Sequence, residues 1–156
     1  MRRNECAILE PEKIREVIES CKYIRIGLYD AGEIYVLPLN FGYAEENGQL
    51  VFYMHGAKEG RKTDLASSRP QVGFEMDSEA EIVSGSVACS FSARYQSVIG
   101  NGELSIVEDR EEKLRGLCAI MRQATGRSDW DFPEKNADAV CVLKLRVTKL
   151  SCKARR

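Results

Sequence analysis

The run from Phe52 to Lys62 concentrates the side chains of this sequence that could do chemistry. Apolar and aromatic residues lead into His55, the only histidine among the 156 residues, and two glycines and three cations follow. If a helix begins at Arg61, its first N–H groups and its dipole add to the charges of Arg61 and Lys62 and favour an anion such as a phosphomonoester. A solvated turn with ordinary surface cations explains the same residues, and residue physics alone favours that simpler interpretation.

The histidine and several aromatic residues are further candidates for a site. His55 could act as a general acid or base or hydrogen-bond a ligand ring, and it could equally be a buried imidazole with satisfied hydrogen bonds. Tyr53 and Tyr95 could pack against a planar ligand or simply fill the core. Trp130 lies in a polar stretch, where an exposed aromatic residue often meets a ligand or a second subunit. None of these residues decides the function by itself.

Several standard catalytic and metal-binding patterns are absent from the sequence. It contains no G-x-S-x-G, G-x-x-x-x-G-K-[ST], G-x-G-x-x-G or H-E-x-x-H. A single histidine cannot complete a Cys2His2 set, and the six cysteines form no C-x-x-C pair, so we predict no metal site. The cysteines are expected to be reduced and mostly buried, with Cys6 or Cys152 near the termini as the best-placed reactive thiol.

The overall composition is that of an ordinary globular domain. The chain is 44% hydrophobic and 30% charged, with a net charge of −1, so no global field would recruit nucleic acid or a membrane surface. No apolar run approaches the ~20 residues of a membrane span, and the first residues lack the pattern of a secretory signal. We therefore expect one domain over residues 1–156, located in the cytoplasm.

Apolar periodicity, β-branched runs and turn residues predict a mainly β chain of the α+β class. Helices are expected at 11–21, 61–68 and 109–125, the last between an Asp109 N-cap and Gly126. Strands are expected at 23–29, 34–43, 50–55, 72–76, 95–107 and 139–150, with an interrupted strand at 79–92, a polar loop at 127–136 and a frayed basic tail at 153–156.

The order of these elements favours an antiparallel barrel with helices packed outside it. Consecutive strands joined by tight turns are typical of that architecture, whereas strict strand–helix alternation would indicate a parallel sheet. Pro38 falls inside the second strand. Because proline has no backbone N–H, it must lie at a sheet edge, at a bulge or beside a ligand.

Three runs together resemble the flavin-binding split barrels of the pyridoxamine 5′-phosphate oxidase superfamily. They are Tyr35–Phe41 (YVLPLNF), Phe52–Lys62 (FYMHGAKEGRK) and Tyr95–Gly102 (YQSVIGNG). The sequence is most similar to the nitroimidazole-resistance (Nim) branch, in which H-G-A-K-E-G-[RK]-K is characteristic. The resemblance covers most of the chain, and it implies a six-stranded split barrel that forms a homodimer with FMN at the subunit interface.

The resemblance also implies roles for residues that match the family position by position. Arg61 and Lys62 correspond to the pair that binds the FMN phosphate, and Tyr53 and Met54 to strand residues that touch the cofactor. Ser97 corresponds to a polar residue near the phosphate end.

The expected strand at 34–43, together with His55 and Trp130, completes the implied site. The segment whose backbone would run beside the isoalloxazine and ribityl groups consists of Val36, Leu37, Pro38, Leu39 and Asn40, which would account for the irregularity at Pro38. His55 corresponds to the branch histidine near the flavin ring, where it would be the catalytic residue. Trp130 has no secure counterpart and is suggested as a lid from the partner subunit.

One departure bears on the activity. The chain ends near Arg156 and lacks the C-terminal Trp- and Arg-rich segment with which pyridoxamine 5′-phosphate oxidases complete their substrate site. The hypothesis is therefore an FMN-dependent oxidoreductase that reduces a small organic acceptor, such as a nitro compound. Two alternatives stay open: a non-catalytic flavin-binding or carrier protein, and a split barrel that has lost its flavin.

Overall fold

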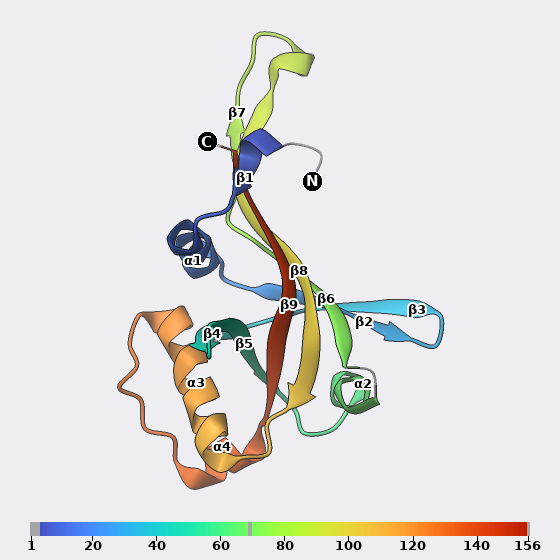
Figure 1. Ribbon diagram of the computed structural model, residues 1–156, viewed down its shortest axis with the longest axis vertical. Helices are drawn as coiled ribbons and strands as arrows, with labels where there is room; N and C mark the ends of the chain where they lie inside the picture. Colours follow the sequence, from blue (N-terminus) through green and yellow to red (C-terminus); the bar gives the residue numbers. More distant parts are fainter. Residues whose placement is uncertain (1–3, 69, 156) are drawn as a thin grey trace.

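The computed structural model describes residues 4–68 and 70–155 (Figure 1). In chain order its elements are η1 (Asn4–Cys6), β1 (Ala7–Ile8), α1 (Pro11–Ser20), β2 (Ile24–Asp30), β3 (Glu33–Leu39), β4 (Phe41–Glu46), β5 (Gln49–Gly56), α2 (Arg61–Ser68), β6 (Gln71–Asp77), β7 (Glu81–Val83), η2 (Ala88–Ser90), β8 (Ser92–Ile106), α3 (Arg110–Thr125), α4 (Glu134–Ala139) and β9 (Cys141–Arg155).

The strands form one antiparallel sheet that curls without closing, as in the split-barrel fold. Seven of them follow one another in the order β3-β2-β6-β8-β9-β5-β4, while β1 pairs with β9 and β7 pairs with β8. The described residues thus contain nine strands, so the prediction of six was wrong. The short β1 carries too little sequence pattern to be recognised, β7 lies within the interrupted strand expected at 79–92, and one predicted strand is in fact two.

That predicted strand, 34–43, is divided at Asn40. Its first half pairs with β2 in a hairpin, where Pro38 faces Arg25, and its second half pairs with β5, where Phe41 faces Met54. β3 therefore ends the sheet path on one side. A proline is tolerated at such an edge because fewer backbone N–H groups are needed for the ladder.

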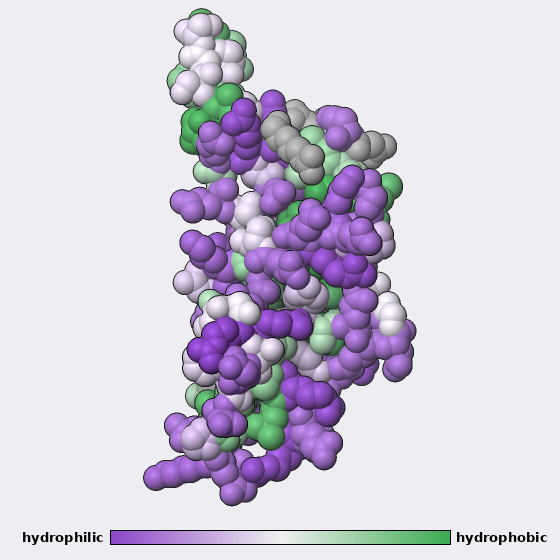
Figure 2. All heavy atoms as spheres, turned by 90° about the vertical axis from the view of Figure 1, so that its left-hand side faces the viewer, coloured by the Kyte–Doolittle hydropathy of each residue, from purple (hydrophilic) through white to green (hydrophobic). Residues whose placement is uncertain are grey.

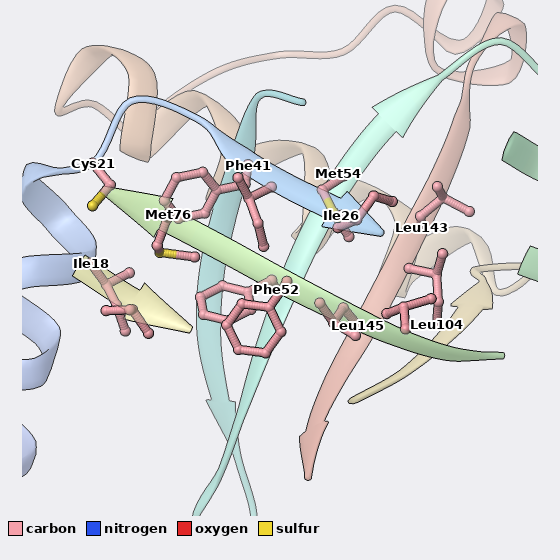
Figure 3. Close-up of a cluster of buried hydrophobic side chains, with 14 of the residues drawn as sticks. Ile18, Cys21, Ile26, Phe41, Phe52, Met54, Met76, Leu104, Leu143 and Leu145 are labelled. Carbon is pink, nitrogen blue, oxygen red and sulfur yellow. The ribbon is translucent and has the colours of Figure 1, made fainter. Parts of the chain in front are cut away.

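The main core fills the inside of the curled sheet. Figure 3 shows side chains from α1 and from both ends of the chain converging on it. Phe52 packs edge-on against Phe41 and Phe74, with ring centroids 5.8 Å and 5.4 Å away. Other members drawn there are Ile18, Cys21, Ile26, Met54, Met76, Leu104, Leu143 and Leu145. These residues come from segments far apart in the sequence, so the core forms only when the whole sheet has assembled.

A second core lies between the sheet and α3, and two glycines allow the close approach. A Cβ on Gly42 would lie 2.1 Å from the carbonyl carbon of Ala119, and a Cβ on Gly116 would lie 2.8 Å from the Tyr53 ring. The helix begins as predicted, with the Asp109 carboxylate accepting a hydrogen bond from the Glu112 N–H at 2.7 Å. α2 contacts β2 and β8 instead, and Figure 1 shows the two helices on opposite sides of the β8–β9 ribbon.

Two predictions near the C-terminus were wrong. The basic tail is not frayed through Arg155, because β9 continues to that residue, paired with β8 and β1. The polar loop at 127–136 contains the start of α4. The fold also removes Cys152 as a reactive thiol, since that side chain is buried, and leaves Cys89 as the exposed one. All six cysteines are unpaired, and Arg156 lies outside the described residues.

Candidate functional site

The start of α2 forms a corner between two strand ends. The loop after β5 ends at Gly60, whose φ of +125° is a conformation that glycine adopts without strain. The Gly60 carbonyl accepts hydrogen bonds from the N–H groups of Thr63 and Asp64, and the Thr63 hydroxyl donates to the Ala57 carbonyl at 3.2 Å. The first N–H groups of such a helix have no acceptor within it. The corner therefore offers backbone donors and a positive dipole end.

Lys62 lies at this corner without a carboxylate partner. Its side chain crosses Gly56, where an added Cβ would lie 1.9 Å from Nζ. Within residues 4–68 and 70–155, no carboxylate oxygen lies within 4.0 Å of that nitrogen. Burial lowers the pKa of Lys62, and burial also raises the pKa of the nearby Cys141 thiol, which therefore stays neutral. A partly buried ammonium with no counter-charge fits an anionic ligand.

Arg61 turns away from Lys62, toward the β2–β3 turn. Its Nε donates to Asp30 Oδ2 at 2.6 Å, and its Nη2 lies 3.6 Å from Glu33 Oε2. The guanidinium carbon stands 4.6 Å from the centroid of the Tyr35 ring. The two residues predicted to bind the phosphate thus begin the same helix but engage different surroundings, and only Lys62 is unpaired.

His55 is exposed on β5, directly before Gly56, the last residue of that strand. Burial by surrounding atoms and then the charge of Lys62 lower the pKa of His55 from its ordinary 6.5. The imidazole is therefore neutral at pH 7, with one nitrogen able to donate a hydrogen bond and the other able to accept one. Its position beside the unpaired lysine suits a group that exchanges a proton with a ligand.

Tyr53 and Met54 lie on opposite faces of β5, in two different cores. Met54 is fully buried in the main core, and Tyr53 is buried beneath α3. Alternate residues of a strand face opposite ways, so the two side chains cannot meet one ligand. Within one chain neither side chain reaches the surface of the corner, and a contact from this segment to a ligand would come from its backbone.

A polar network around Tyr53 was not anticipated from the sequence. The Tyr53 hydroxyl donates to Glu46 at 2.5 Å and lies 3.2 Å from Glu112. Lys144 Nζ lies 2.6 Å from Glu46 and 2.5 Å from Glu112. The available signal was Lys144 itself, a charged residue inside the apolar run of the last strand. Every member has a partner here, so the network joins β4, β5, α3 and β9 rather than presenting free groups.

The segment from Val36 to Asn40 is divided between two faces. Leu37 and Leu39 pack against the main core, whereas Val36 is 59% exposed and Pro38 is also exposed. The alternation of a strand produces this division. Val36, Pro38 and Asn40 accordingly belong to the outer face of the sheet, where a ligand or a partner could reach them.

Ser97 and Trp130 are not brought to the corner within one chain. Ser97 pairs with Asp77 at the end of β6, roughly 23 Å along β8 from Leu104, whose N–H bonds to Pro70 just after α2. Trp130 lies in the loop after α3, where its Nε1 donates to the Arg127 carbonyl at 3.2 Å. The guanidinium of the same Arg127 stacks on the Trp130 ring. Neither residue is near Lys62 unless a second subunit supplies it.

Two features are absent among the described residues. These residues contain no group of three or more histidine, cysteine or acidic residues placed to hold a metal ion. They also contain no helix that is both long and apolar enough to cross a membrane.

Comparisons with solved structures extend over nearly the whole chain. A candidate 5-nitroimidazole antibiotic resistance protein from Bacteroides thetaiotaomicron is 28% identical, with a TM-score of 0.80 over 95% of this chain and 86% of that one. The flavocytochrome Anf3 from Azotobacter vinelandii is 19% identical, with a TM-score of 0.79 over 100% of this chain and 72% of that one. The FAD- and haem-binding protein from Mycobacterium smegmatis is 15% identical, with a TM-score of 0.80 over 96% and 73%. These last two show the shared fold.

Family comparison agrees with the resemblance of the three runs. No curated protein matches the chain. A family model described as pyridoxamine 5′-phosphate oxidase matches residues 10–154, which include both helix α2 and the whole sheet apart from β1 and the last residue of β9. With this match and the split-barrel fold, the chain belongs to the pyridoxamine 5′-phosphate oxidase family.

Proposed function

We propose that the protein binds FMN and carries electrons from a reduced donor to a small organic acceptor such as a nitro compound. The family supports the flavin, and the similarity to a candidate 5-nitroimidazole resistance protein supports the class of acceptor. The single observation that carries the proposal is Lys62, a partly buried cation at the start of α2 with no counter-charge among the described residues.

The residues of the corner fit the phosphate end of FMN. A phosphomonoester carries about −1.5 to −2 charges, which the unpaired Lys62 and the helix dipole would balance. Backbone N–H groups at the start of α2 would supply hydrogen bonds to its oxygens. Arg61 could add a second cation if its guanidinium were shared between the phosphate and Asp30. We place the phosphate at this corner for these reasons.

The remaining residues would position the cofactor and move a proton. When bound, the flavin would supply the redox chemistry, whereas the protein supplies binding, orientation and electrostatics. His55 is neutral near pH 7 and carries one N–H, so it can donate a hydrogen bond or a proton to the acceptor. The exposed side chains of Val36, Pro38 and Asn40 would form the wall on the outer face of the sheet.

The proposal includes a homodimer with the flavin between its subunits. The predicted residues Val36 and Ser97 both point to the outer side of the sheet, away from the main core. Ser97 does not lie beside Lys62 in one chain, so a second subunit would have to supply it, and Trp130 would come from the partner as a lid. The proposed location is the cytoplasm, which six unpaired cysteines support.

The visible absorbance and mass spectra of the purified protein test the cofactor. We expect a yellow protein, or one that becomes yellow on addition of FMN, with FMN released on denaturation. A protein that stays colourless after FMN addition contradicts the proposal.

Reoxidation of the reduced protein tests the activity separately. In the absence of oxygen, a nitroaromatic compound should reoxidise the bound cofactor much faster than buffer alone. The variant His55→Asn should bind FMN but react more slowly. A protein that binds FMN yet shows no reoxidation by any acceptor is a flavin carrier rather than an oxidoreductase.

A further inference from the structure

A hairpin arm made of residues 81–94 projects from the body of the molecule. It contains β7, η2 and the first residues of β8, and Figure 1 shows it extending beyond β1 and both chain ends. Figure 2 shows it as a lobe of mainly white and green spheres above a largely purple face. Its tip is ordered by Ser90, whose hydroxyl donates to the Val87 carbonyl at 2.8 Å and accepts from the Val87 N–H at 3.2 Å.

The arm has one apolar face and one charged face. Ile82 pairs with Ala93, and Phe91 is extended and precedes Ala93 by two residues, so these three side chains share a face. Ile82 is 66% exposed and Phe91 52% exposed. Glu81 and Arg94 form an ion pair at 3.1 Å on the opposite face. An ordered element that exposes large apolar side chains on one side only is typical of a binding surface.

The apolar face of the arm continues along the outer side of β8. Phe91, Ala93, Tyr95, Ser97 and Ile99 follow at intervals of two residues, so they point the same way. Val98, between the last two, is fully buried on the core side. Ile99 is 49% exposed. The arm and the outer face of the sheet therefore form one continuous surface.

A shallow hollow of about 350 Å³ lies at the other end of this surface. Its lining consists of three glycines, Val36, Phe74 and the ion-paired Arg25 and Glu75, and Gly27 pairs with both Val36 and Gly73 across three strands. Around it stand the exposed side chains of Val36 and, further along β3, Ile34. Small residues between exposed apolar ones leave room for large side chains from another surface.

We propose that the apolar face of the arm docks in this hollow on a second copy of the chain, while the partner's arm docks in the hollow of the first. The inference deepens the homodimer of the proposed function and rests on it. The arm cannot reach the hollow of its own chain, because Phe91 and Ile99 are roughly 26 Å apart along the extended segment that continues into β8. A two-fold axis near Tyr95 and Ser97 would set the β8 strands antiparallel and satisfy both contacts at once.

This arrangement accounts for features that a single chain leaves unused. It covers Ile82, Phe91, Ile34 and Val36 together, and it leaves the Glu81–Arg94 pair facing solvent. It also brings the arm to the outer face of the partner's β3 edge, beside the predicted cofactor segment.

Cross-linking tests the contact directly, with the native exposed thiol of Cys89 at the arm tip as one end. In the variant Val36→Cys, a short bismaleimide should join Cys89 to position 36 of the other copy and double the mass on a denaturing gel. The double variant Val36→Cys with Cys89→Ser should lose this product. Asp131→Cys, in the exposed loop after α3, should not give it.

Sedimentation velocity gives a second measurement. The double variant Ile82→Glu with Phe91→Glu should raise the dissociation constant of the dimer roughly 100-fold or more, whereas Glu81→Gln on the opposite face should leave it unchanged.

Three outcomes overturn the inference: no Cys89-dependent cross-link, a cross-link within one chain, or a dimer indifferent to the double variant. The absorbance spectrum with FMN is read independently of all three. A yellow protein without the arm contact refutes only this inference, whereas a colourless protein refutes the proposed function.

Discussion

Two lysines, Lys62 and Lys144, separate a candidate binding corner from a structural network. Both side chains are partly buried. Lys62 lies over Gly56 at the end of β5, and Lys144 lies near the start of β9, the strand that pairs with β5. Burial disfavours the charge of Lys144, but hydrogen bonds to Glu112 and Glu46 outweigh this and raise its pKa. Burial lowers the pKa of Lys62, which has no such partner among the described residues. The same residue type therefore has two carboxylate partners in one region and none among the described residues in the other.

The difference separates a region that stabilises the fold from the region proposed to bind a ligand. A paired buried charge is costly to break, because removing one partner leaves the other uncompensated. An unpaired buried charge already weakens the folded state, so its removal should cost little stability, while any anion it binds would lose a partner. Substitutions at and around the two lysines test this contrast.

Removal of the paired lysine should strongly destabilise the fold. In Lys144→Met, the carboxylates of Glu46 and Glu112 lose their cation beneath α3, and we expect the free energy of unfolding to fall by about 3 kcal/mol. Urea unfolding followed by circular dichroism measures it. The matched variant Lys62→Met should change stability by less than about 0.5 kcal/mol. Equal losses of unfolding free energy in the two variants would contradict the distinction between the paired and the unpaired lysine.

Removal of the unpaired lysine should mainly weaken FMN binding. A hydrogen bond to a charged group contributes about 1.5–3 kcal/mol, so Lys62→Met should raise the dissociation constant for FMN roughly 10- to 100-fold. The affinity for riboflavin, which lacks the phosphate, should hardly change. Lys58→Met, an exposed cation in the same loop, is the control. Equal weakening of FMN and riboflavin would place the phosphate elsewhere.

The single histidine reports on the charge of Lys62. Because the charge of Lys62 helps to lower the pKa of His55, Lys62→Met should raise that pKa toward 6.5, as should the phosphate of bound FMN. An NMR titration follows one imidazole without assignment. A His55 pKa that is the same in the variant and the parent contradicts the proximity of the two side chains.

The lowered pKa of His55 also predicts that the stability of the fold depends on pH. The folded pKa of His55 lies below its ordinary value of 6.5, so the unfolded chain binds more protons between the two values. The stability contributed by neutral His55 is complete above pH 6.5 and is lost as the pH falls through the folded pKa. Urea unfolding at several pH values should show a smaller acid loss in His55→Asn, and an identical profile would count against the shift.

The smallest effect should come from the Arg61 ion pair. Asp30 and Arg61 are both partly exposed, and such pairs contribute about 0–1 kcal/mol to stability, so Asp30→Asn should hardly alter unfolding. Loss of a carboxylate that competes for Arg61 should instead tighten FMN binding a few-fold, as measured by fluorescence titration. If FMN binds more weakly while riboflavin is unaffected, Asp30 positions Arg61 for the phosphate rather than competing for it.

Much of the fold was predictable from local patterns, and the failures have physical causes. α1, α2 and α3 occur where periodicity and caps placed them, because those signals act within a few residues. The break at Asn40 was missed, because the two halves of that segment differ only in the strands they pair with. Fraying at 153–156 is the expectation from a polar, basic composition, which gives no sign of the pairing with β8 and β1 on either side.

The candidate site was predictable as a motif but not as an arrangement. The residues from His55 to Lys62 do form a strand end, a loop and a helix start. Their sequence did not show that Arg61 would pair with Asp30 while Lys62 stayed unpaired. It also did not show that Ser97 would lie far along β8, since distances between strands depend on the register of the whole sheet.

The sequence by itself determined the three longer helices, most of the strands, the family and the residue types at the corner, because these depend on short-range patterns. Only the tertiary structure decided which of two neighbouring cations is free, which faces of β3 and β8 point outward, and that residues 81–94 stand away from the body. These properties depend on burial and on contacts between distant segments. The fold places Glu46 and Glu112 beside Lys144 and no carboxylate of the described residues beside Lys62, although both are simply lysines in the sequence.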